Sequence, residues 1–98
     1  MINDVIWSPA AEKDFESILN YLLSNWNDKV INRFINRIDD IISLIVEDPN
    51  IFPLINEQLQ IRKVVISKQN TLYYRRKAGK LEIVRVFDSR QDPIKLKF

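Results

Sequence analysis

The spacing of apolar residues changes along this 98-residue chain, and the change limits the fold more than any other feature. Up to about residue 48, apolar residues recur at steps of three and four, which is typical of amphipathic helices. From residue 61 onwards they alternate with polar residues, which is typical of strands with one buried face. A chain of this length builds one small core, so the helices have to pack on the strands.

Two helices are predicted in the first half. The first begins at Pro9, because Ser8 is a favoured N-cap and proline fits the first helical position. The second is capped by Asn27 or Asp28 and ends before Pro49, since the residue before a proline resists the helical conformation. A short polar turn joins them and predicts an antiparallel helical hairpin.

Strands are predicted on both sides of this hairpin. A short one covers Val5–Trp7, and three more cover residues 61–66, 71–76 and 81–87. Gly79 is the only glycine, and it supplies the positive φ that the last hairpin turn requires. Residues 49–60 are predicted to be a loop with three buried anchors: Ile51, Phe52 and Leu54.

The predicted fold is therefore α+β, in the order β-α-α-β-β-β, as a single domain over residues 1–98. The N-terminal strand and the helical hairpin are expected to pack on one face of a small antiparallel sheet. No other arrangement buries both apolar helix stripes. The other sheet face is expected to stay partly open.

Charge is divided between the two parts of the chain. Residues 1–60 hold four basic and ten acidic side chains, whereas residues 61–98 hold eleven basic and three acidic ones. This asymmetry favours a basic surface suited to phosphates or to an acidic partner. Pairing of the two halves across the fold is the alternative reading.

The composition excludes several kinds of chemistry. The chain has no Cys and no His, so disulfides, thiolate or imidazole metal sites and histidine acid–base steps are excluded. No metal site and no cofactor are predicted, since phosphate-loop and metal-ligand spacings are absent. Apolar runs are too short to span a membrane, and the start lacks the basic region of a signal peptide. We therefore expect a cytoplasmic protein without membrane contact.

Basic and aromatic residues alternate along the predicted strands. Four of them are candidates for nucleic-acid binding: Lys68, Tyr74, Arg75 and Arg85. Arginine suits phosphates, and flat rings can stack on bases. A solvated sheet face, on which cations prevent edge-to-edge aggregation, is the alternative.

A polar cluster follows the last predicted strand, where the chain leaves the sheet. In this cluster Arg90 can clamp a phosphate, and Asp88 can accept a proton or orient Arg90. The alternative is a structural turn at Asp92-Pro93, with Arg90 paired to Asp88. Spacing alone leaves both readings open.

Three segments together resemble the RelE/ParE superfamily of toxins from bacterial type II toxin–antitoxin systems. They are the strand-then-helix start over residues 5–15, Ile61-Arg62 with Leu72-Tyr73-Tyr74, and residues 83–93. The resemblance covers essentially the whole chain. It implies a small toxin that a neighbouring antitoxin neutralises, with the pair forming a hetero-oligomer.

The resemblance also implies candidate catalytic residues. In one branch of the superfamily the toxin cuts messenger RNA on the ribosome, and Arg62 and Arg90 lie at or beside basic positions of that branch, with Asp88 where several relatives have histidine. Ribosome-dependent, metal-independent mRNA cleavage is the leading prediction, with Arg62, Arg90 and Asp88 as the catalytic set.

Two alternatives stay open. In another branch the toxin poisons DNA gyrase without acting as an enzyme, and Thr71 and Gln91 depart from the basic residues of the cleaving branch. A degenerate toxin that only binds its antitoxin is the third reading. In every case we expect an antitoxin with an acidic, amphipathic segment that folds on binding.

Overall fold

The computed structural model describes residue 2 and residues 4–98. Its elements, in chain order, are β1 (Asp4–Trp7), α1 (Pro9–Asn25), α2 (Asp28–Glu47), β2 (Leu54–Asn56), β3 (Ile61–Ser67), β4 (Asn70–Lys77), β5 (Lys80–Asp88) and the short 3-10 helix η1 (Pro93–Lys95). The α+β class and the predicted order are confirmed, with β2 as an added short strand.

Both helices begin where their caps predict. The Ser8 Oγ accepts a hydrogen bond from the Ala11 backbone N–H at 3.0 Å, and Asn27 Oδ1 accepts one from Val30 N–H at 3.1 Å. Asn27, not Asp28, is therefore the cap of α2. Each cap satisfies a backbone donor that has no partner inside the helix.

The five strands form one sheet in the order β1-β5-β4-β3-β2. β1 runs parallel to β5, while the other neighbouring pairs are antiparallel. The sheet is mixed, and β1 forms one of its edges. Ser8 fixes the corner between β1 and α1, because its Oγ donates to the Val84 carbonyl at 2.7 Å.

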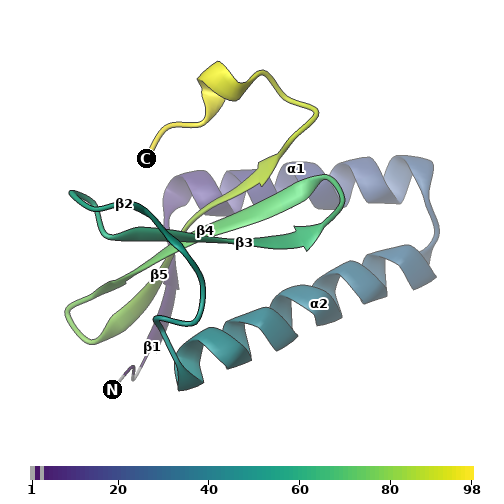
Figure 1. The fold of residues 1–98 in the computed structure, drawn as a ribbon. Coiled ribbons are helices and arrows are strands. Elements are labelled where there is room, and N and C mark those ends of the chain that lie inside the picture. Colours follow the sequence, from purple (N-terminus) through teal and green to yellow (C-terminus); the bar gives the residue numbers. More distant parts are fainter. Residues whose placement is uncertain (1, 3) are drawn as a thin grey trace.

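The main core lies between the sheet and the helical hairpin. Figure 1 shows α2 below the sheet and the C-terminal segment above it. Fully buried side chains from both layers meet in this core, among them Ile41 and Ile45 of α2, Leu72 and Tyr74 of β4, and Leu81 and Ile83 of β5. Burial of these apolar surfaces holds the two layers together.

A smaller core lies on the opposite sheet face. It contains Ile61, Tyr73, Val84 and Phe87, with Leu96 of the C-terminal segment packed against them. The Phe98 ring lies 5.2 Å from the Tyr73 ring, centroid to centroid. The face that we expected to be partly open is thus covered in part by the end of the chain.

Two expectations about the middle of the chain are wrong. Ile51 and Leu54 are not buried anchors, since 46% and 36% of their surfaces are exposed. Only Phe52 is partly buried, with its ring edge-on to Tyr74 at 6.5 Å between centroids. The short β2 holds this segment at the sheet edge through backbone pairing with β3, so its side chains need not be buried.

A bulge interrupts β5 at Val84 and Arg85. Tyr73 pairs with Arg85 while Tyr74 pairs with Ile83, so β5 has one more residue than β4 at this point. Strict alternation would place Ile83 and Val86 on opposite faces, yet both belong to the main core. The bulge therefore keeps Arg85 out of the main core.

Candidate functional site

A hollow of about 510 Å³ lies between the helical hairpin and the β3–β4 turn. We call it the hinge groove, and its floor is apolar, formed by Ile18, Leu22, Val30, Phe34 and Ile66. Two aromatic side chains, Tyr21 and Trp26, also line it and are 39% and 57% exposed. An apolar hollow bordered by exposed rings is suited to take up a partner's side chains.

Four cations line the same groove. They are Arg33 and Arg37 of α2, Lys68 of the β3–β4 turn, and Arg90 beyond β5. Arg37 is partly engaged, since its Nε donates to the Ile66 carbonyl at 3.2 Å. The groove therefore joins an apolar floor to a basic rim, a combination that attracts an acidic amphipathic segment.

The Asp88–Arg90 pair lies next to this groove. Arg90 Nε lies 2.9 Å from Asp88 Oδ1 and 3.1 Å from Oδ2, and the backbone N–H of Arg90 also donates to Oδ1 at 2.9 Å. These bonds to Arg90 lower the pKa of Asp88, although its burial opposes the shift. The carboxylate is stabilised in its charged form and is a weak base.

Arg90 is also held by an aromatic ring. Its guanidinium carbon lies 4.0 Å from the centroid of the Tyr21 ring on α1, within cation–π range. The bonds to Asp88 raise the Arg90 pKa. Asp88 and Tyr21 thus fix the orientation of a cation that remains about one-third exposed.

A buried acceptor lies beside the pair. Asn70 is 8% exposed, and its Nδ2 donates to Ser67 Oγ at 2.9 Å. Its Oδ1 is buried and makes no hydrogen bond within the described part of the chain. Asn70 lines the hinge groove, so this oxygen is a polar feature of an otherwise apolar interior.

Arg62 lies elsewhere. Its Nη1 donates to the Phe52 carbonyl at 2.7 Å, which fastens it to the loop after α2. Together with Tyr74 and Arg76 it lines a second hollow, of about 370 Å³. Arg62 therefore belongs to a different site from Arg90.

The register of the sheet gives the separation between the two sites. Arg62 is paired with Tyr74, and Asp88 is paired with Asn70. Tyr74 and Asn70 are four residues apart in β4, so the two backbone positions are about 13 Å apart along the strand. The structure thus brings Asp88, Arg90 and Lys68 together and leaves Arg62 apart from them, near the start of β3.

The remaining candidates have structural partners. Tyr74 is 1% exposed, and its hydroxyl donates to the Pro49 carbonyl at 2.9 Å, while Arg75 pairs with Glu82 at 2.6 Å. A buried ring has no face free for base stacking. The paired Arg75 lies on the opposite sheet face from Tyr74, since neighbouring side chains alternate.

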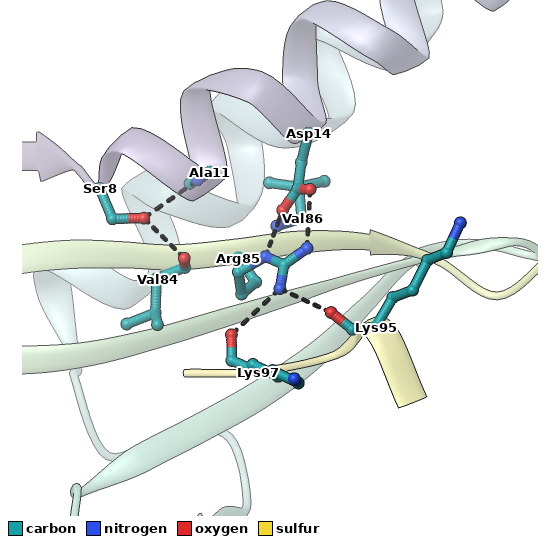
Figure 2. Close-up of polar contacts among 8 residues, drawn as sticks. All are labelled: Ser8, Ala11, Asp14, Val84, Arg85, Val86, Lys95 and Lys97. Atoms are coloured by element: carbon teal, nitrogen blue, oxygen red, sulfur yellow. Dashed lines mark hydrogen bonds and ion pairs between the residues drawn. The ribbon is translucent and has the colours of Figure 1, made fainter. Parts of the chain in front are cut away.

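Arg85 is the most enclosed of the candidates. It is 9% exposed, and its guanidinium meets Asp14 of α1 on one side and the backbone carbonyls of Lys95 and Lys97 on the other, as Figure 2 shows. The pair with Asp14 raises the Arg85 pKa. This arginine fastens the helix, the sheet and the C-terminal segment to one another.

The sequence analysis did not single out four residues that line this groove: Tyr21, Trp26, Arg33 and Arg37. The available signal was the spacing of the two arginines, four residues apart and therefore neighbours on the helix surface. Which groove they would border depended on the packing of α2 against β3, which the sequence does not give.

Two further findings concern the described residues as a whole. Among them, no group of three or more acidic, histidine or cysteine side chains is placed to hold a metal ion. No helix in this part of the chain combines the length and the apolar character needed to cross a membrane.

Solved structures with the same fold are toxins of toxin–antitoxin systems. A chain of the chromosomal ParDE system from P. aeruginosa matches with a TM-score of 0.72 at 14% identity, covering 90% of this chain and 96% of that chain. A YoeB/ParE toxin from Agrobacterium tumefaciens matches with a TM-score of 0.63 at 15% identity, covering 88% and 98%. A chain of the E. coli DinJ–YafQ toxin–antitoxin complex matches with a TM-score of 0.63 at 13% identity, covering 92% and 96%.

These likenesses define the fold as that of the RelE/ParE toxins. The sequence itself matches the family of the ParE toxin of the type II toxin–antitoxin system parDE over residues 5–93. The chain therefore belongs to the ParE toxin family, within the predicted superfamily. A search of curated proteins gave no match.

Proposed function

We propose that this toxin arrests growth by binding DNA gyrase, without cleaving RNA. The observation that carries the proposal is the separation of Arg62 from the Asp88–Arg90 pair, which the strand register sets at about 13 Å along the sheet. Two groups so far apart cannot act on one phosphate. Of the two mechanisms that the superfamily resemblance implies, inhibition by binding needs no such assembly.

The chemistry of Asp88 supports this choice. Cleavage by a ribose 2′-OH requires a base, and the chain has no His. Asp88 is bound to Arg90, which lowers the Asp88 pKa and weakens it as a base. The positive charge of Arg90 is largely neutralised by Asp88. Arg90 is therefore a poor stabiliser of the negative charge that develops on the phosphorus during cleavage.

The hinge groove is the surface that we assign to the target. Tyr21, Trp26 and the arginines of its rim are residue types that carry most of the binding energy in protein interfaces. Their apolar floor gives a partner's side chains a place to be buried. The proposal places gyrase contact here and places the toxin in the cytoplasm with that target.

An antitoxin is the second partner that we propose. The relatives from S. aureus and E. coli were solved as YoeB–YefM and DinJ–YafQ complexes. An acidic amphipathic segment fits the basic rim and apolar floor of the hinge groove. Binding there would block the target surface directly.

Ribosome-dependent mRNA cleavage is the competing function, and one observation favours it. Arg62, Arg76 and Tyr74 line the 370 Å³ hollow, so two guanidinium groups face a space that would take one phosphate. In this reading Arg90 and Asp88 are structural, and the ribosome supplies the missing base.

Two parallel reactions separate these functions. The full-length chain, made by cell-free synthesis, is added to gyrase with relaxed plasmid and ATP, and to ribosomes translating a defined messenger. We expect loss of supercoiling with accumulated DNA breaks, and intact messenger ends. Cleaved messenger with normal supercoiling would overturn the proposal, and no effect in either reaction would leave only the degenerate toxin.

A variant sharpens the comparison. Arg62→Ala/Arg76→Ala removes both cations of the second hollow and leaves the hinge groove intact. We expect this double variant to inhibit gyrase as the parent does. Loss of inhibition, in a variant whose circular dichroism is unchanged, would move the site to the second hollow.

A further inference from the structure

The outer face of α2 carries a regular pattern that extends beyond the two arginines of the hinge groove. Asn32-Arg33 and Asn36-Arg37 repeat the same pair one helical turn apart, and Lys29 precedes them by a turn. All five side chains are exposed, and with Asp40 they line a shallow hollow of about 670 Å³. We call these five residues the α2 stripe.

We propose that the α2 stripe binds duplex DNA by entering its major groove. An α-helix with its side chains is about 10–12 Å across and fits a groove about 12 Å wide. Arginine pairs bidentately with guanine, and asparagine pairs with adenine, through the edges exposed there. The stripe presents two of each along one side of one helix.

The position of α2 allows this approach. The helix lies at the outside of the molecule, with its buried face, Phe34, Ile38, Ile41 and Ile45, turned to the core. Figure 1 shows α2 running along the lower border of the fold, with no element beyond it. A duplex can therefore meet the stripe without displacing another element.

Charge supports the same occupant. Among the described residues, Lys29 and Arg33 form no ion pair, so their charges are available to phosphates. The rim of the hinge groove adds Lys68, and Arg33 and Arg37 line both hollows. The cations therefore continue beyond the helix on one side, as a track for one DNA backbone.

The stripe has clear limits. Asp28 begins α2, and Asp39 and Asp40 follow the stripe, so the basic part of the helix covers about two and a half turns. This length matches the few residues by which recognition helices contact base edges. The carboxylates after Arg37 restrict the contact to the first half of the helix.

The shape of the major groove favours a DNA duplex over an RNA duplex as the partner of the α2 stripe. The major groove of an RNA duplex is too deep and narrow to admit a helix. A flat electrostatic contact would accept either duplex, whereas an inserted helix accepts only DNA. The inference does not depend on gyrase, since the contact is made by the toxin alone.

Fluorescence anisotropy with labelled duplexes tests the inference. The full-length chain is titrated into a DNA duplex of about 20 base pairs and into the matching RNA duplex, over a range of salt concentrations. We expect DNA binding with a dissociation constant of about 1 µM at about 50 mM salt, and RNA binding at least about tenfold weaker. Equal affinity for both duplexes, or no DNA binding, would overturn the inference.

Three double variants locate the contact. Lys29→Ala/Arg33→Ala should weaken DNA binding at least about tenfold and lower the salt slope by about 2. Lys77→Ala/Lys80→Ala removes the same charge from the exposed β4–β5 turn and should leave the slope unchanged. Asn32→Ala/Asn36→Ala should weaken binding several-fold at an unchanged slope.

Each variant can overturn the inference by itself. An equal loss in the β4–β5 control would mean that net charge alone binds DNA. Unchanged affinity in the asparagine variant would mean that α2 does not enter the groove. The binding assay contains no gyrase. Absence of DNA binding would therefore not contradict the proposed function, and absence of gyrase inhibition would not contradict DNA binding by the α2 stripe.

Discussion

Asp14 of α1 binds Arg85 of β5 through both of its carboxylate oxygens. Arg85 Nε lies 2.7 Å from Oδ2, and Nη2 lies 2.9 Å from Oδ1 (Figure 2). Asp14 Oδ2 also accepts the Val86 backbone N–H at 3.0 Å, directly after the bulge. One carboxylate therefore stabilises the irregular part of β5 and orients the arginine that holds the C-terminal segment.

Asp14→Ala is predicted to be strongly destabilising. Both side chains of the pair are only 11% exposed, so the variant leaves Arg85 charged, nearly buried and without its carboxylate. Loss of one partner of such a pair costs about 3–5 kcal/mol of unfolding free energy. Urea unfolding measures this loss, with Glu16→Ala, exposed on the same helix, as control. Equal stability of the two variants would refute the role of Asp14.

The parts of the fold that the sequence predicts are those set by local chemistry. Some of these features act within a few residues, so they can be predicted without a structure. They are the Ser8 cap, the proline after it and the alternation in β3. At Val84 the apolar residues change from odd positions (81 and 83) to even ones (84 and 86), a signal that the strand prediction did not take up. Asp14, which is distant in the sequence, binds Arg85 and the Val86 N–H beside the bulge.

The candidate site shows the same division. The Asp88–Arg90 pair is two residues apart, and the sequence offered it as one of two readings. Separation of Arg62 from Arg90 depends on strand register, and burial of Arg85 depends on Asp14 and on the C-terminal carbonyls. Counts of charged residues give neither the register nor the burial. The basic residues are therefore divided between two sites and do not form the single basic surface that the charge asymmetry favoured.

The pH dependence of stability is predicted to involve Asp88. Its pKa is lowered by the bonds to Arg90, so the pair stabilises the fold above the ordinary carboxyl pKa of about 4 and loses this contribution as pH falls through the lowered value. Urea unfolding of the parent and of Asp88→Asn should differ most near neutral pH, and the difference should shrink in acid. A constant difference at every pH would contradict this assignment.

Truncation of the Leu96 side chain in the C-terminal segment is predicted to expose the smaller core. Leu96 packs on Ile61, Tyr73, Val84 and Phe87, so Leu96→Ala should lower the unfolding free energy. Because Leu96 is only partly buried, we expect a loss of about 2 kcal/mol, the lower end of the range for buried leucines. Binding of a hydrophobic dye should increase. Ile94→Ala, at a side chain 73% exposed in the same segment, is the control and should change neither quantity.

Substitutions in the β4–β5 turn are predicted to increase the stability of the protein. Ala78 has φ 53° and Gly79 has φ 76°, so an alanine occupies a left-handed position that disfavours a Cβ. Ala78→Asn or Ala78→Gly should stabilise the protein by up to about 1 kcal/mol. Thermal unfolding checks this, and Gly79→Ala should shift the midpoint in the opposite direction. A lower midpoint for both Ala78 variants would show that the turn is not strained.

Trp26 is predicted to matter for toxicity and not for folding. Its side chain is 57% exposed, so Trp26→Ala should change the unfolding free energy by less than about 0.5 kcal/mol. It also lines the hinge groove, and loss of such an aromatic contact weakens an interface by about 2 kcal/mol or more. Growth arrest after induced expression should therefore be relieved. Leu23→Ala is the matched control, since Leu23 is 63% exposed in α1, three residues before Trp26, and outside the groove lining. Full toxicity of Trp26→Ala would remove the hinge groove as the target surface.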